Sequence, residues 1–198
     1  NGSLVQSTGS FSVGRGGLTG GSAGNYALFA GGYIHYTDES KDDVYYNTVD
    51  AFNSSLTRSA ATGLSVARSE TFAVNTGARL LFAGGVKNNG ATYLSTVDTY
   101  DSSLTRMTAA SLPKALANED MAGVPLDGKA LIEASDRMLV YDESMTLTIL
   151  ETFDSTYGTR YEAAAAVVGS YGLFAGGYGN MGGLSSNTRL NLVRAYTI

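Results

Sequence analysis

The string Leu-Phe-Ala-Gly-Gly occurs three times in this chain of 198 residues, and this repetition restricts the possible folds more than any other feature of the sequence. The copies cover residues 28–32, 81–85 and 173–177. A degenerate copy, Leu-Ile-Glu-Ala-Ser, covers residues 131–135, between the second and third exact copies. The chain is therefore predicted to contain four repeats of one structural unit, because repeats of this length stack side by side to bury a shared core.

Two further features recur with the same period. A second string reads VDAFNSSLTR from Val49 and VDTYDSSLTR from Val97, and it is degenerate from Met138 and from Val193. An arginine stands 15 residues before the repeated alanine in three repeats, and a glutamate takes this place in the third repeat. These four positions are Arg15, Arg68, Glu119 and Arg160.

Each repeat is predicted to form four short strands. In the second repeat, Glu70–Asn75 alternates in polarity and Arg79–Ala83 is a continuous apolar run. Leu94–Tyr100 and Leu104–Thr108 follow, separated by the tight turn Asp101–Ser103. The composition agrees, because 25 glycines and only 2 prolines suit many strands joined by tight turns. Four antiparallel strands in about 45–50 residues are typical of one blade of a β-propeller.

One segment has a competing helical signal. The alanines of Tyr161–Val168 favour a helix by their intrinsic propensity. The segment nevertheless aligns without gaps to Ser69–Thr76, which is predicted to be a strand. We therefore expect a strand here and an all-β fold for the whole chain.

The repeats resemble those of the kelch family. The double glycine after an apolar strand is similar to the kelch hallmark, the VDxYD string resembles its third strand, and Ala67–Arg68 is similar to the pair that precedes its innermost strand. The chain departs from the family in having no tryptophan, with Leu56 and Leu104 at the usual aromatic position. The residues of the LTR and FAGG strings also resemble those of kelch-like arrays in surface and phage-tail proteins of gut bacteria. The resemblance implies a kelch-type β-propeller, and the four repeats predict four four-stranded blades in a single domain, residues 1–198.

The two ends of the chain suggest how such a ring would close. The last repeat stops at Ile198, just after its predicted third strand, and Leu4–Gln6 aligns with the predicted outer strand Leu56–Arg58. We therefore expect the N-terminal strand to complete the last blade and to hide two sheet edges. A fragment of a longer propeller is the alternative.

Composition excludes several classes of chemistry. The chain has no cysteine and one histidine, His35, which removes thiolate catalysis, Cys-bound metals and multi-histidine metal sites. A net charge of −5 argues against a nucleic-acid partner, and no apolar run is long enough for membrane insertion. We expect no cofactor. The acidic loop with Asp38, Ser40 and Asp42 alternates oxygen donors and is a weak calcium candidate, with a solvated loop tip as the favoured interpretation.

The recurrent arginines allow two interpretations. A ring would bring them together, and their guanidinium groups could bind a carboxylate, sulfate or phosphate. Alternatively, each arginine hydrogen-bonds backbone carbonyls or an acid of a neighbouring blade. We favour this structural role for Arg15, Arg68 and Arg160, because Glu119 in the remaining repeat would supply an anion from within the chain.

The loops after each double glycine vary most between repeats. Tyr33–Asn47 and Tyr178–Arg189 are long, Val86–Tyr93 is intermediate, and Asp136–Arg137 is short. All must leave one face of the molecule, since they occupy the same place in each repeat. Tyrosines with small polar neighbours are typical of recognition surfaces. The candidate ligand-binding residues on these loops are Tyr33, Tyr36, Asp43, Tyr45, Asn88, Asn89, Tyr178 and Asn180.

These features predict a non-catalytic binding module. The expected partner is a glycan or protein on a cell surface, and the expected setting is an adhesin or a phage tail, extracellular or virion-associated, within a larger fibre or oligomer. A polysaccharide hydrolase or lyase that uses carboxylates on the loop face is the first alternative. A structural spacer domain is the second.

Overall fold

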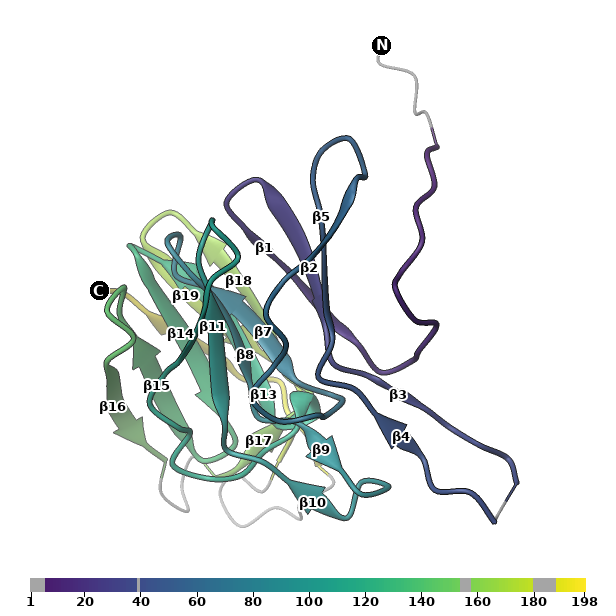
Figure 1. The fold of residues 1–198 in the computed structure, drawn as a ribbon. Helices are drawn as coiled ribbons and strands as arrows, with labels where there is room; N and C mark the ends of the chain where they lie inside the picture. Colours follow the sequence, from purple (N-terminus) through teal and green to yellow (C-terminus); the bar gives the residue numbers. More distant parts are fainter. Residues whose placement is uncertain (1–5, 39, 154–157, 180–187) are drawn as a thin grey trace.

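The protein is described here by a computed structural model, which covers residues 6–38, 40–153, 158–179 and 188–198 (Figure 1). These residues contain no α-helix, and the only helical turn among them is the 3₁₀ turn Asn118–Asp120. No helix in this part of the chain has the length and hydropathy needed to span a membrane. The expected all-β class is confirmed.

Four antiparallel sheets follow one another along the chain. The strands of the first sheet are β1 (Thr19–Ala23), β2 (Tyr26–Ala30), β5 (Val49–Phe52) and β6 (Arg58–Ala60). Those of the second are β7 (Phe72–Asn75), β8 (Leu80–Ala83), β11 (Val97–Tyr100) and β12 (Arg106–Thr108). Those of the third are β13 (Met121–Leu126), β14 (Lys129–Ala134), β15 (Arg137–Tyr141) and β16 (Leu147–Thr152). The fourth has β18 (Ala164–Val168), β19 (Tyr171–Ala175) and β22 (Val193–Tyr196).

Each sheet is a meander in which strands adjacent in sequence are paired, apart from the insertions after the double glycines. The predicted strands of the second repeat all form, although each is shorter than its apolar segment. The alanine-rich segment is strand β18, as its alignment predicts, because cross-strand packing overrides helix propensity. Only Ser135 and Asp136 separate β14 from β15, whose first residue is Arg137, and the short connection expected in the third repeat is confirmed.

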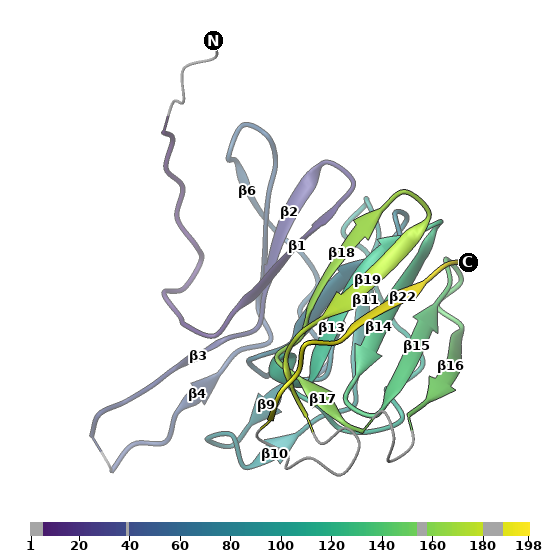
Figure 2. The same ribbon diagram turned by 180° about the vertical axis from the view of Figure 1, so that it is seen from behind.

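The insertions form small ribbons at one end of the sheets, the lower end in Figure 1. The first is the hairpin of β3 (Tyr33–Ile34) and β4 (Val44–Tyr45), and the second is the hairpin of β9 (Val86–Lys87) and β10 (Thr92–Tyr93). The third pairs β17 (Arg160–Tyr161), β20 (Tyr178–Gly179) and β21 (Thr188–Arg189). The turns that join neighbouring strands, such as those between β1 and β2 and between β5 and β6, lie at the opposite end (Figures 1 and 2).

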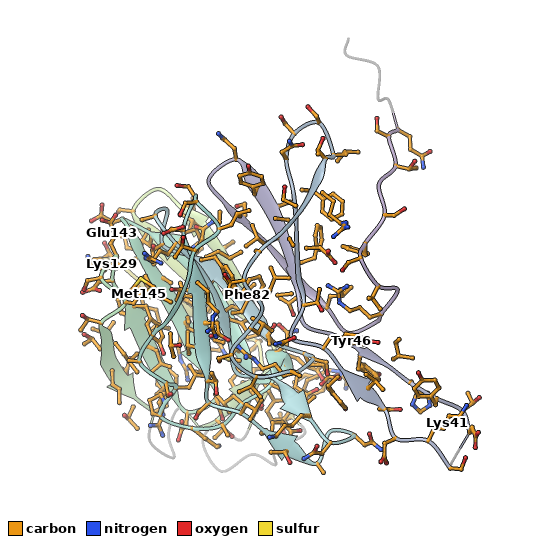
Figure 3. All side chains as sticks on the ribbon, in the orientation of Figure 1. Lys41, Tyr46, Phe82, Lys129, Glu143 and Met145 are labelled. Atoms are coloured by element: carbon orange, nitrogen blue, oxygen red, sulfur yellow. The ribbon has the colours of Figure 1, made fainter. Side chains whose placement is uncertain are left out.

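The hydrophobic core lies between successive sheets. Leu28 and Val49 of the first sheet pack with Phe82 and Tyr100 of the second, and Figure 3 shows Phe82 between these two sheets. A second cluster joins the second and third sheets, and a third cluster joins the third sheet to Phe174 of the fourth. The innermost strands β1, β7, β13 and β18 are neighbours in that order. The sheets are therefore stacked in sequence order, each burying a face against the next.

The structure does not show the expected closure by the N-terminus. Leu4 and Val5 lie outside the described residues, and the segment that follows them runs beside the first sheet rather than the fourth (Figures 1 and 2). Phe11 packs edge to face against Phe29 and Phe52, and the Ser12 hydroxyl donates to Asp50 at 3.0 Å. These contacts hold the N-terminal segment on the first sheet. In the described part of the chain the fourth sheet has three strands.

Candidate binding cleft

The clearest candidate site is a cleft between the β3–β4 and β9–β10 hairpins, with a volume of about 310 Å³. Insertions from two adjacent repeats meet there because both leave the same end of their sheets (Figure 1). This size is at the lower limit of small-ligand sites. The lining residues are Tyr33, His35, Asp43, Tyr45, Glu70, Val86, Asn89 and Gly90.

Two tyrosine rings form one wall of the cleft. Tyr33 and Tyr45 are paired across the β3–β4 ribbon, and their rings are stacked with centroids 5.5 Å apart and an interplanar angle of 15°. Both side chains are half-buried. A Cβ at Gly17 would lie 2.9 Å from the Tyr33 ring, so the backbone of the first repeat supports this wall from behind. The stack therefore packs on the backbone of the first repeat and also lines the cleft.

The phenol of Tyr45 lies near the turn of the second hairpin. Burial raises the pKa of Tyr45, while the backbone N–H groups of Gly90 and Asn89 act in the opposite direction. These donors come from a turn in which Asn88, Asn89 and Gly90 all have φ between 53° and 76°. Asparagine and glycine adopt this left-handed conformation most readily, so the Asn-Asn-Gly sequence fixes the turn that reaches Tyr45.

A carboxylate on the edge of the cleft is held within the same hairpin. Asp43 is largely buried, and its Oδ1 accepts a hydrogen bond from the Tyr36 backbone N–H at 3.2 Å. The same oxygen lies 2.9 Å from Nδ1 of His35, whose ring is 65% exposed. The single histidine is thus an exposed loop residue with an acidic partner. The hydrogen bonds of Asp43 to the described residues all go to this one oxygen.

Glu70 enters the cleft from the second repeat, and sequence reasoning did not select it. It has φ of 53°, and its backbone N–H donates to the carbonyl of Gly17 at 3.1 Å. The repeat pattern contains a signal that could have found it. The segment after the recurrent arginine begins the innermost strand at the end of the sheet where the double-glycine loops leave, so its first residues lie beside those loops.

The structure brings together four of the eight predicted ligand-binding residues: Tyr33, Asp43, Tyr45 and Asn89. Tyr36 belongs to the same hairpin but is absent from the lining; it is 37% exposed, and the Lys41 ammonium lies 5.6 Å from its ring centroid. The hairpin extends away from the sheets, with Lys41 near its tip and Tyr46 near its base (Figure 3).

Of the other three predicted residues, two are absent from the cleft lining and the third is not described. The Asn88 amide donates to Thr92 within its own turn at 3.2 Å. Tyr178 stacks on Tyr161 in the fourth repeat with ring centroids 6.1 Å apart, and Arg189 lies 5.4 Å from its ring centroid. Asn180 lies outside the described residues.

The first two recurrent arginines have fully buried side chains with acidic partners in their own repeats. Arg15 pairs with Asp50 at 3.0 Å, and Arg68 pairs with Asp98 at 2.9 Å. Arg15 also donates to the Gly31 carbonyl at 2.7 Å. Burial lowers the pKa of Arg68, and Asp98 opposes this shift. Guanidinium groups that are paired in this way have their charge satisfied within the repeat.

The third arginine pairs with an acid of the preceding sheet. Arg160 Nε donates to Glu133 of β14 at 2.7 Å, its Nη2 contacts the second carboxylate oxygen, and Arg194 donates to the same carboxylate at 2.7 Å. Glu119, which stands at the arginine position by sequence count, lies in the 3₁₀ turn with an exposed side chain. Its carbonyl accepts a hydrogen bond from the Glu162 backbone N–H.

The acidic loop of the first hairpin is held by its own hydrogen bonds. Asp38 Oδ1 accepts from the backbone N–H and the hydroxyl of Ser40, and these bonds lower the pKa of Asp38. Asp42 is exposed. Within the described ranges no group of three or more histidine, aspartate or glutamate side chains is arranged to hold a metal ion.

A larger depression of about 630 Å³ lies at the opposite end of the first sheet. Its lining comes from the turns of that one sheet, including Gly24, Asn25 and Ser54, and its only aromatic residue is Tyr26. It therefore lacks the convergence of two repeats that the hairpin cleft has.

A scan against protein-family models finds no match for this chain, and a search of curated proteins finds none either.

Proposed function

We propose that this chain is a non-catalytic module that binds a cell-surface glycan in the cleft between the β3–β4 and β9–β10 hairpins. The observation that carries the proposal is the Tyr33–Tyr45 stack beside Asp43 and Asn89 in one cleft. An aromatic ring offers an apolar face to the C–H groups of a pyranose. Carboxylate and amide groups at the edge would orient the sugar through its hydroxyls. The setting that suits such a module is an adhesin or a phage tail.

We also propose that the four sheets are kelch-type blades in an open array. Support comes from the strand order within each sheet and from the double glycine that follows the second strand of three of them. The stacking of successive sheets through their faces is the arrangement that propeller blades use. Such a scaffold fixes loop positions while the loops vary, which is how repeat folds separate stability from recognition.

The test is glycan-array screening of the chain, followed by titration of the strongest glycan with variants. Tyr33→Ala removes one ring face of the stack and should weaken binding about tenfold or more, equivalent to at least about 1.4 kcal/mol. Tyr36→Ala is the control within the same hairpin and should retain binding, because Tyr36 does not line the cleft. Circular dichroism establishes that both variants are folded.

A second pair of variants separates the two ends of the molecule. Asn89→Gly changes an exposed turn of the cleft, and Asn25→Gly changes an exposed turn of the larger depression at the opposite end. Binding should fall for Asn89→Gly and remain unchanged for Asn25→Gly. If Asn25→Gly alone weakens binding, the glycan binds at the opposite end of the molecule and the proposed site is wrong.

One observation favours a second candidate, a polysaccharide hydrolase. Asp43 and Glu70 line the same cleft, and most glycoside hydrolases use a pair of carboxylate residues for catalysis. Incubation of the bound polysaccharide with the chain should release new reducing ends if this candidate is correct, and Glu70→Gln should abolish the release. Binding without any product supports the non-catalytic proposal.

A further inference from the structure

The fourth sheet has an apolar face that no described residue covers. Cross-strand pairing places the side chains of β18, β19 and β22 that share this face opposite one another. Its residues are Ala164, Ala166, Val168, Tyr171, Leu173, Ala175, Val193 and Ala195, and none of them is charged. Val168 is 58% exposed and Tyr171 is 49% exposed. A contiguous apolar face of this kind on a sheet marks an interaction site.

Comparison with the other repeats identifies what this face is. Val49, Val97 and Val193 are equivalent residues, each paired with the alanine before the double glycine. Val49 is 1% exposed and Val97 is 0% exposed, because the next sheet covers each of them. Val193 is 58% exposed. The face is therefore one half of the interface that the chain already makes between its own successive sheets.

The other half of that interface is present on the first sheet. At two of the three places where sheets meet, an aromatic pair of the following sheet fills the apolar face: Phe82 and Tyr100 in the second sheet, Phe174 and Tyr196 in the fourth. The pairs are edge to face, with centroids 5.8 Å apart in both sheets. Phe29 and Phe52 form the same pair on the outer face of the first sheet, with centroids 6.0 Å apart.

The segment before the first sheet also matches an interface element. Ser12 and Arg15 bond Asp50 as Ser65 and Arg68 bond Asp98. Phe11 therefore corresponds to Leu64, which is 2% exposed between the first two sheets, whereas Phe11 is 38% exposed. A groove of about 280 Å³ runs beside Phe11, Phe29 and Phe52. Among the described residues, the first sheet thus has an aromatic face that resembles half of the internal interface and is covered only in part, by the segment with Phe11.

We propose that the uncovered face of the fourth sheet binds the Phe29–Phe52 face of the first sheet of a second copy of this chain. The contact continues the sheet-to-sheet interface that the chain makes three times internally. Charge is compatible, because the exposed face has no charged residue and Asp50 on the incoming face is already paired with Arg15 and Arg58. The interface joins unlike surfaces, so the copies form either a closed ring or a growing array.

Sedimentation velocity of the full chain over a wide range of concentration tests the proposal. The wild-type chain should self-associate. Val168→Lys places a charge on the uncovered face and should weaken association about tenfold or more. Val167→Lys is the matched control, because Val167 is the neighbouring residue, 44% exposed, and points to the opposite face of the same strand. A wild-type chain that stays monomeric, or association that survives Val168→Lys, would overturn the proposal.

A mixing experiment identifies which surface binds the uncovered face of the fourth sheet. Ala27 is exposed on the Phe29–Phe52 face and is equivalent to the buried Leu80, so Ala27→Lys should also prevent self-association. Each variant keeps the half that the other lacks, and a mixture of Val168→Lys with Ala27→Lys should therefore form one-to-one complexes. If Ala27→Lys still self-associates, the fourth sheets pair with each other and the head-to-tail arrangement is wrong. If the mixture stays monomeric, the two faces are not partners.

Discussion

An aspartate on the third strand of the first two sheets illustrates how single residues stabilise the repeat. Asp98 is fully buried and accepts hydrogen bonds from Ser65, Arg68 and Arg106, which come from the preceding connection and the outer strand. Asp50 has equivalent donors in the first repeat. A buried carboxylate is tolerated only when it is paired and hydrogen-bonded in this way. The recurrent aspartate therefore connects three elements of its repeat.

Removal of the Arg68 side chain should lower the free energy of unfolding strongly. Arg68→Ala leaves Asp98 buried with its principal charged partner missing, and we expect a loss of about 3–5 kcal/mol of unfolding free energy in denaturant titration. Arg79→Ala is the control, because Arg79 and Asp101 form a partly exposed pair at 3.5 Å and should contribute less than about 1 kcal/mol. An Arg68→Ala chain of unchanged stability that has lost sulfate binding would instead support an anion site.

The pH dependence of stability should report on Asp50. Burial alone would raise the pKa of this carboxyl, but the hydrogen bonds from Ser12 and Arg15 outweigh it and the pKa lies below its ordinary value. Its stabilising contribution is complete above the unfolded-state pKa of about 3.9 and disappears as pH falls through the lower folded-state pKa. Asp50→Asn should therefore be less stable than wild type at neutral pH, with a gap that narrows in the acid range. A gap that is independent of pH would contradict this role.

At the scale of elements, the double glycine shows how one repeat fits the next. Gly84 has φ of 63°, and a Cβ there would overlap the carbonyl oxygen of Leu116 in the connection to the third sheet. Gly31 meets the Arg68 carbonyl in the same way. Gly176 also has positive φ, 68°, yet no described atom lies within 4 Å of its Cβ position. The recurrent glycine is required where another sheet follows.

Two alanine substitutions test this difference. Gly176→Ala should cost only the left-handed backbone strain, on the order of 1–2 kcal/mol. Gly84→Ala should cost about 1–3 kcal/mol more, because the methyl group must displace a packed backbone carbonyl. Thermal unfolding of the two variants, at a concentration where the chain is monomeric, measures the difference. Equal destabilisation would mean that contact with the following connection is unimportant.

The strands could be predicted well from the sequence because the repeats can be aligned. A segment with an ambiguous local pattern is then assigned from the equivalent segments of the other repeats. The helix-forming alanines of β18 were correctly assigned by alignment alone. The cleft was half predicted: tyrosines and asparagines on loops that leave the same end were expected to gather, and Tyr33, Tyr45 and Asn89 do. Tyr36 was predicted to bind ligand but does not line the cleft, because the twist of a two-residue ribbon decides which side chains turn inward. Glu70 lines the cleft but was not predicted, since it precedes the innermost strand of the second sheet and does not belong to a double-glycine loop. The path of the N-terminal segment depends on the Phe11 contacts, which no repeat alignment reveals.

At the scale of the whole molecule, the inserted hairpins and the uncovered sheet faces lie on different sides of the protein. The hairpins project from one end of the sheets, whereas the proposed contacts between copies lie at the two ends of the row of sheets (Figures 1 and 2). Assembly would therefore place several copies of the cleft on one side. Single glycan contacts of this size have dissociation constants in about the millimolar to micromolar range, so several linked copies would raise the effective affinity.

The central claim, that ligand binds between the two hairpins, is tested most directly by backbone NMR of the chain during titration with the strongest glycan. The account predicts that chemical shifts change for Tyr33, Tyr45, Glu70 and Asn89, which line the cleft. The shifts of Ser102 and Ser103, in a turn at the opposite end of the second sheet, should remain constant. Shift changes confined to those turns, with the hairpin residues unaffected, would contradict the account.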